Sequence, residues 1–151
     1  MIMVTIDPGI NGTGYAIWGN KELKKYGVII PPKQFKSLKD KAGYIITQLD
    51  IAMCKYLSKF NKVYVEEPAF FQSAGGRVTA GSGSLIKLTL LVGMIINKFD
   101  AMSVKVNDWK GQLPKEVVIQ RIKNTLKEQV KDVKTHAWDA IGMGLYLKGR
   151  F

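Results

Sequence analysis

Residues 1–19, MIMVTIDPGINGTGYAIWG, carry the strongest structural signal in this chain. The first six residues alternate in the manner of a buried strand, and the carboxylate of Asp7 ends the apolar run abruptly. Residues 8–12 predict a tight turn, because glycine and asparagine tolerate the backbone angles of a reversal. Residues 13–18 resume the strand pattern. Asp7 is therefore either the cap of a hairpin or an acid at a metal-dependent phosphate site.

The amino-acid composition limits the classes of protein to which this chain can belong. The chain has 151 residues, of which 46% are hydrophobic, so we expect one folded domain over residues 1–151. No apolar run approaches the ~18 to 20 residues that a membrane span requires, and the opening lacks the basic leader of a signal peptide. Cys54 is the only cysteine, which excludes an internal disulfide and a cysteine-cluster zinc site. We expect an intracellular, cytoplasmic protein.

The charge balance points to a polyanionic partner. The formal net charge is +11, which is large for a chain of this size. Nucleic acid is the favoured partner. A membrane surface is disfavoured, because no segment is both basic and strongly amphipathic. The remaining interpretation is that the lysines mainly confer solubility.

The rest of the chain alternates between strand and helix patterns. The further predicted strands are residues 24–30, 62–65 and 102–106. The predicted helices are residues 37–60, with Cys54 packed inside it, 84–96, 114–128, and a last one capped by Thr135. The helix over residues 84–96 is apolar over a wider arc than one contact face needs, which favours a central position or a subunit interface.

A second strand also ends in acids, in the stretch VYVEEPAFF. Neighbouring side chains on a strand point to opposite sides, so only one of Glu66 and Glu67 can face Asp7. We predict that Glu66 faces inward and that Glu67 faces outward. The alternative is an ordinary surface charge pair where a strand runs into a loop.

Residues 69–84, AFFQSAGGRVTAGSGS, form the least regular region. Phe70 and Phe71 beside Arg77 suit stacking on nucleic acid bases. The alternative is that at least one of the two phenylalanines only plugs the edge of the domain. Further along, Lys110 and Lys115 are candidate phosphate contacts, although solvated lysines are the commoner case.

The chain closes with the motif HAWDAIGMGLY. His136 and Asp139 are three residues apart on a predicted helix, so they share a face and can point at one site. The alternative is a satisfied core histidine. The spacing favours the functional interpretation, because the only histidine is paired with an acid on a face that should be packed.

The three motifs IDPGINGTGYAI, VYVEEPAFF and HAWDAIGMGLY, in this order and over nearly the whole chain, resemble the RuvC-type Holliday junction resolvases. The resemblance implies an α/β architecture of the RNase H-like type, with a central mixed five-stranded sheet flanked by helices. It also implies paired, symmetric nicking of a four-way DNA junction, which leaves 5′-phosphate ends. The brevity and lysine bias suit a phage or viral member, which would act in the host cytoplasm.

The same resemblance assigns a site. It implies that Asp7, Glu66, His136 and Asp139 are the catalytic and metal-binding residues, since the family accepts Asp or His at the position of His136. Oxygen ligands favour Mg²⁺, two ions per site, with Mn²⁺ able to substitute. Because a nitrogen ligand suits Mn²⁺ somewhat better, activity should be higher with Mn²⁺. Glu67 falls where the family does not need an acid, and it is a candidate for a residue that supports the metal ligands without binding a metal itself.

The resemblance also implies contacts with DNA and with a second copy of the chain. Lys110 and Lys115 fall near the family lysines at the scissile phosphate, and Phe70 or Phe71 falls near the aromatic that enters the junction. Two nicks on opposing strands need two sites, and therefore a homodimer.

Other activities fit parts of this pattern. An RNase H-fold nuclease could act on other branched DNA or on an RNA:DNA hybrid, and a catalytically inactive module could bind junctions only. Actin-like ATPases and sugar kinases share the opening turn. These enzymes normally need two such domains around a nucleotide, whereas a chain of 151 residues supplies only one, so this interpretation is disfavoured.

Overall fold

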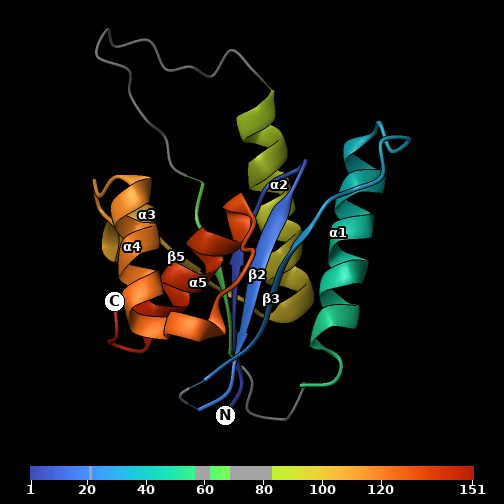
Figure 1. Cartoon of the computed structure of the whole chain (residues 1–151). Helices are drawn as coiled ribbons and strands as arrows, with labels where there is room; N and C mark the ends of the chain where they lie inside the picture. Colours follow the sequence, from blue (N-terminus) through green and yellow to red (C-terminus); the bar gives the residue numbers. More distant parts are fainter. Residues whose placement is uncertain (21, 57–61, 69–82) are drawn as a thin grey trace, which may run out of the picture.

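The alternating segments assemble into one mixed sheet. A computed structural model of the chain describes residues 1–20, 22–56, 62–68 and 83–151. Strands β1 (Met3–Asp7), β2 (Thr13–Trp18) and β3 (Leu23–Ile29) form an antiparallel meander. Strands β4 (Lys62–Glu66) and β5 (Met102–Val104) add parallel to β1, giving the order β3-β2-β1-β4-β5 within the described residues (Figure 1). The predicted mixed five-stranded sheet is therefore confirmed.

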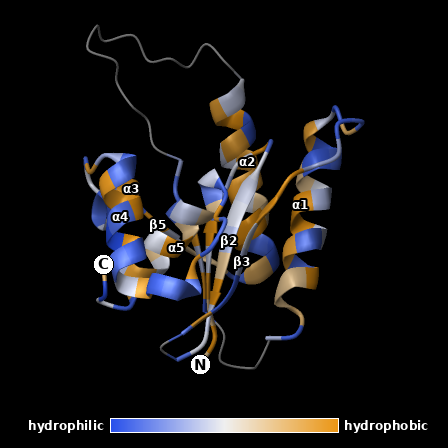
Figure 2. Cartoon of the chain, in the orientation of Figure 1, coloured by the Kyte–Doolittle hydropathy of each residue, from blue (hydrophilic) through white to orange (hydrophobic). Residues whose placement is uncertain are grey.

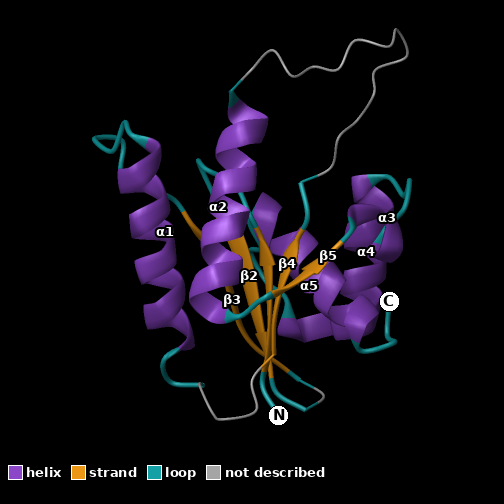
Figure 3. Ribbon diagram, turned by 180° about the vertical axis from the view of Figure 1, so that it is seen from behind, coloured by secondary structure: helices purple, strands orange, loops and turns teal. Residues whose placement is uncertain are grey.

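Helices cover both faces of this sheet. Helices α1 (Leu38–Met53) and α2 (Ser84–Phe99) lie over one face, and α5 (Thr135–Leu147) lies over the other, where it packs on β1 and β2 (Figures 1 and 3). The short helix α3 (Val106–Trp109) and helix α4 (Lys115–Leu126) pack against α5. A single 3₁₀ turn, Lys127–Gln129, follows α4.

One hydrophobic core lies on each side of the sheet. Hydrophobic residues, orange in Figure 2, occur in the strands and in the helices that flank them. The period of two along β1 assigns its side chains to the two cores in turn. Val4 and Ile6 belong to the core under α1 and α2. Met3 belongs to the core under α4 and α5, and Thr5 donates a hydrogen bond of 2.7 Å to the carbonyl of Ala140 on that same side. Asp7, two residues further along, must therefore face α5.

The first predicted helix is shorter than expected. Ser37 caps it, since its Oγ accepts a hydrogen bond from the backbone N–H of Asp40, but the helix ends at Met53 and not at residue 60. The chain leaves the helix in a turn closed by the Tyr56 N–H and the Met53 carbonyl. The prediction that Cys54 packs inside the helix is wrong, because Cys54 lies just beyond its last turn and is exposed.

Several other boundaries also differ from the prediction, among them the end of α2, which lies at Phe99 and not at residue 96. Strand β5 stops at Val104, because Val106 turns inward to begin α3, a helix that the sequence pattern did not predict. Helix α4 ends at Leu126, where Lys127 takes a positive φ of 47°. Thr135 is the first residue of α5 and not its cap. The extended Lys134 precedes it, and no side chain makes a capping hydrogen bond.

Helix α2 buries one side and exposes an apolar stripe on another. Leu91, Val92 and Ile95 are in the core. The stripe consists of Ile86, Leu90 and Met94, which are spaced four residues apart and are 66%, 52% and 40% exposed. The wide apolar arc is thus split between a core face and a solvent face.

None of the helices in the described ranges combines the length and the apolar character needed to cross a bilayer.

Candidate active site

Two carboxylates end neighbouring parallel strands on the same face of the sheet. Val63 and Val65 of β4 join the core under α1 and α2, so Glu66 points to the α5 side, as Asp7 does. Strands β1 and β4 pair in register as far as Ile6 and Val65, which places the two acids side by side at the carboxyl edge. The sequence prediction for Glu66 therefore agrees with its place in the structure.

Glu67 lies on the other side of β4 and serves a different partner. Its carboxylate accepts a hydrogen bond of 2.6 Å from the hydroxyl of Ser103 on β5. Its backbone N–H continues the ladder by donating to the carbonyl of Val104. The outward placement predicted for Glu67 agrees with these contacts.

Helix α5 brings His136 and Asp139 to the same edge. Gly14 of β2, the register partner of Asp7, permits the approach, since a Cβ there would collide with the backbone carbonyl of His136. The preceding turn is held by Thr13, whose hydroxyl donates to the Gly9 carbonyl at 2.9 Å. The one histidine is consequently set against the end of β1.

His136 contacts Asp7 directly. Its Nδ1 lies 2.9 Å from the Oδ2 of Asp7. This hydrogen bond is the main cause that raises the pKa of His136, while burial is the main cause that raises the pKa of Asp7. Because Nδ1 is engaged with Asp7, only Nε2 of His136 is available to a water, a metal or a substrate.

Glu66 is held by a residue that sequence reasoning missed. The indole N–H of Trp109 donates to Oε2 of Glu66 at 2.9 Å, and Trp109 is only 3% exposed. Gly142 of α5 makes room for the ring, since a Cβ there would lie 2.7 Å from Trp109 Cζ3. Burial, and then the negative charge of Asp7, raise the pKa of Glu66 to about 7.

Two lysines hold Asp139. Lys110 Nζ donates to Oδ1 at 3.1 Å, and Lys115 Nζ donates to Oδ2 at 2.9 Å. Asp139 is 8% exposed, so both of its oxygens meet a positive charge in a shielded place. The two lysines predicted to lie at the scissile phosphate thus reach the site and contact its third carboxylate.

The carboxylates and the imidazole of this site are the kinds of group that bind hard divalent cations. Buried carboxylates whose pKa values are raised gain from a nearby positive charge, and oxygen donors with one imidazole suit Mg²⁺ or Mn²⁺. Within the described residues, no three His, Cys, Asp or Glu side chains gather closely enough to hold one metal ion. Asp139 would have to exchange a lysine contact before it could join Asp7 and Glu66.

Comparison with solved structures finds a similar fold in RuvC. T. thermophilus RuvC in complex with Holliday junction substrate superposes with a TM-score of 0.68 over 97% of this chain and 92% of that chain, at 19% identity. The chain has the RuvC fold. A second Thermus thermophilus RuvC structure gives a TM-score of 0.66 at 19% identity, covering 99% of this chain and 98% of that one. No protein-family model matches the sequence, and no curated protein matches it.

The RuvC fold places four of the nine predicted functional residues around one edge of the sheet and brings two more to it. Asp7, Glu66, His136 and Asp139 form the centre, and Lys110 and Lys115 reach it through Asp139. The predictions for Phe70, Phe71 and Arg77 fall outside the described residues and stay predictions.

Replacing Trp109 with Phe tests the hydrogen bond to Glu66. The change keeps an aromatic ring in the core but removes the indole N–H, which lowers the pKa of Glu66 in the native protein. The pKa of Glu66 should therefore rise further above about 7 in the metal-free variant, as followed by a carboxyl ¹³C NMR titration. Trp138→Phe is the control, because that ring lies beside Lys123 in the same core. An unchanged Glu66 titration in Trp109→Phe would contradict this assignment.

Proposed function

We propose that this protein is a metal-dependent endonuclease that resolves four-way DNA junctions by paired, symmetric nicking. The observation that carries the proposal is the convergence of Asp7, Glu66, His136 and Asp139 at the carboxyl edge of β1 and β4. The fold supports it, since the similar T. thermophilus RuvC was solved in complex with a Holliday junction substrate. The formal net charge of +11 supports a nucleic acid substrate.

Asp7, Glu66 and Asp139, with His136 as a nitrogen donor, would hold Mg²⁺, two ions per site, or Mn²⁺ in its place. When bound, divalent ions supply charge neutralisation at the scissile phosphate and a more acidic attacking water. His136 has two tasks open to it through Nε2, as a metal ligand or as the group that orients the water, while Nδ1 stays on Asp7.

Lys110 and Lys115 are the proposed phosphate-binding residues of this site. Each donates to Asp139 in the structure, so the oxygens of a bound phosphate would compete with that carboxylate for the same ammonium groups. Lys110 Nζ also lies 4.9 Å from the centroid of the Trp109 ring, the same ring whose N–H donates to Glu66. Lys110 and Lys115 therefore neutralise the charge of Asp139 until a DNA strand binds.

Paired nicking on opposing strands requires two sites, and we propose a two-fold symmetric homodimer. The exposed stripe of Ile86, Leu90 and Met94 on α2 is the surface that supports this proposal. A two-fold axis close to α2 would pack the stripe of one protomer on that of its partner. Leu88, by contrast, is half-buried and faces a hollow next to the site.

Leu90→Glu is expected to convert the homodimer to a monomer. A charge on the stripe would have to be buried without a partner in the dimer, whereas it stays hydrated in the monomer. Sedimentation equilibrium should then give half the mass of the wild type. Ile51→Glu on α1 is the matched control, because Ile51 is 58% exposed and Leu90 is 52% exposed. Equal masses for the wild type and Leu90→Glu would overturn this interface.

The substrate proposal is tested by comparing three labelled nucleic acids. A synthetic four-way junction, a linear duplex of the same sequence and an RNA:DNA hybrid are each incubated with the protein and Mg²⁺ or Mn²⁺. We expect paired nicks with 5′-phosphate ends on the junction alone, and faster cutting with Mn²⁺. Preferential cutting of the hybrid would keep a nuclease and overturn the substrate. Tight junction binding without cutting would leave a binding module.

A further inference from the structure

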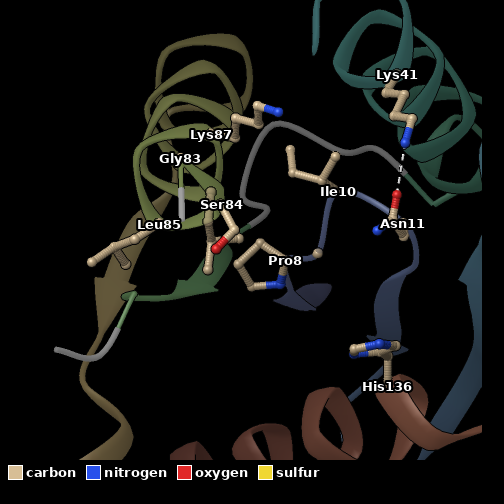
Figure 4. A pocket seen from close by; sticks show the side chains of 11 residues that line it. Pro8, Ile10, Asn11, Lys41, Gly83, Ser84, Leu85, Lys87 and His136 are labelled. Carbon is tan, nitrogen blue, oxygen red and sulfur yellow. Dashed lines mark hydrogen bonds between the residues drawn. The ribbon is translucent and has the colours of Figure 1, made fainter. Parts of the chain in front are cut away.

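A hollow of ≈ 660 Å³ opens beside His136 (Figure 4), and its described lining does not include Lys110 or Lys115. Its walls come from the turn after β1, from α1 and from the first turns of α2. His136 closes the end nearest the catalytic carboxylates. A substrate strand lying across the site would therefore pass over this hollow.

The lining combines an apolar seat with a positively charged rim. Pro8, Ile10, Leu85 and Leu88 supply the apolar part. Lys41 extends from α1 and Lys87 extends from α2. Ile10, in the turn after β1, lies between these two lysines in Figure 4. The described lining contains no Asp or Glu.

A smaller hollow of ≈ 330 Å³ continues the positive rim. It shares Asn11 and Lys41 with the first hollow and adds Lys33 and Lys36. Lys41 is steadied where the two meet, since its Nζ donates to Asn11 Oδ1 at 2.7 Å. The lysines that line the two adjoining hollows supply positive charge of the kind that a nucleic acid backbone requires.

From these features we propose that the larger hollow binds one unstacked nucleotide of the substrate strand next to the scissile phosphate. The base lies against Ile10 and Leu88, and the adjoining phosphates lie at Lys41 and Lys87. The volume is of the size that takes a small organic ligand, roughly 300 to 1,000 Å³. This inference rests on the proposed nuclease function and extends it to the choice of substrate.

The chemistry gives a reason for selecting branched DNA. A base can enter an apolar pocket only after it leaves the stack, and unstacking costs least where a base is already unpaired. The crossover of a four-way junction offers strands with weakened stacking, whereas a linear duplex does not. The hollow would thus favour strands at a branch without reading their sequence by hydrogen bonds.

The test uses four-way junctions that carry 2-aminopurine, a base whose fluorescence rises on unstacking, at each position next to the cut site in turn. Full-length protein is added in EDTA, so that binding is measured without cutting. We expect the fluorescence to rise at one position with the wild type and to stay low with Leu88→Trp, which fills the hollow. Junction affinity is measured over a range of salt concentrations with Lys41→Glu and Lys87→Glu, which keep the apolar seat.

Lys39→Glu is the matched control, because Lys39 is exposed on the same helix and about 200° around it from Lys41. The slope of log affinity against log salt should become shallower by about 1 for Lys41→Glu and for Lys87→Glu, and stay as in the wild type for Lys39→Glu. Fluorescence that stays low at every position with the wild type would overturn the nucleotide seat. Equal salt slopes for Lys41→Glu and Lys39→Glu would overturn the phosphate contacts. Either failure leaves the nuclease proposal intact if the wild type still cuts junctions when Mg²⁺ is added.

Discussion

Glu66→Gln is expected to stabilise the metal-free protein at pH 8 and to reduce junction cleavage by roughly a thousandfold or more. The native pKa of Glu66 is raised from an ordinary 4.5 to about 7, first by burial and then by Asp7. The contribution of Glu66 to stability is therefore full below about pH 4.5 and is lost as pH rises through about 7. Above pH 7 the buried charge costs up to roughly 3 kcal/mol, and glutamine removes that cost. Under the proposed function Glu66 would hold a metal ion, so its replacement should reduce cleavage by removing several kcal/mol of charge stabilisation.

Urea unfolding in EDTA at pH 5 and pH 8 separates the two proteins. The wild type should lose stability relative to Glu66→Gln between these pH values, by about 1 to 3 kcal/mol. Adding Mg²⁺ at pH 8 should raise the unfolding midpoint of the wild type more than that of the variant, since a ligand that binds only the native state stabilises it. If the unfolding free energies of the two proteins change with pH in the same way, the raised pKa of Glu66 is contradicted.

Gly14→Ala is expected to destabilise the protein by about 3 kcal/mol. Gly14 lies in β2 opposite Asp7, and an added Cβ would meet the backbone carbonyl of His136 and lie 2.9 Å from the N of Ala137. Backbone cannot rotate away as a flexible side chain can, so α5 must move off the sheet. The hydrogen bond between His136 and Asp7 depends on that packing, and the pKa of His136 should fall toward its ordinary value when the contact is lost.

Gly43→Ala on α1 is the matched control. A Cβ at Gly43 would have nothing within 4 Å, so the change should stabilise the helix by up to about 1 kcal/mol. Urea unfolding of both variants, together with an NMR titration of His136, measures the stability and the site at once. Similar unfolding free energies for Gly14→Ala and Gly43→Ala would contradict the close approach of α5 to β2.

The sheet and the placement of the acids could be predicted because they depend on a simple alternation. Side chains on β1 and β4 change sides at every residue, so the apolar residues before Asp7 and Glu66 determine which way the acids face. Helical spacing does the same for His136 and Asp139. Both rules depend only on residues that are close in the sequence. Few pairings of the strands are compatible with the sides to which these rules assign the acids.

The contacts around the acids could not be predicted from the sequence. Trp109 lies on a helix of four residues, too short to show a period, and its partner Glu66 is 43 positions away. The only signals were an aromatic residue next to Lys110 and a glycine at position 142 that could accept a large ring. The contact of two lysines with Asp139 likewise depends on how α3 and α4 pack against α5.

Helix ends and surface faces were missed for a related reason. The apolar spacing in the sequence fits a helix as far as residue 60, but the chain enters a turn at residues 54–56, directly after Met53. On α2 the hydrophobic residues do not reveal which of them face the sheet, which face the hollow and which face solvent. Only the packing on β4 and α1 separates Leu91 from Leu88 and Leu90.

Cleavage of an end-labelled four-way junction by the wild type and by Asp7→Asn, with binding measured on the same preparations, addresses the proposed active site as a whole. We expect the wild type to nick opposing strands at symmetric positions when Mg²⁺ or Mn²⁺ is added. Asp7→Asn should bind the junction with similar affinity and leave it uncut. Equal cleavage by both proteins would mean that the catalytic centre does not lie at the end of β1.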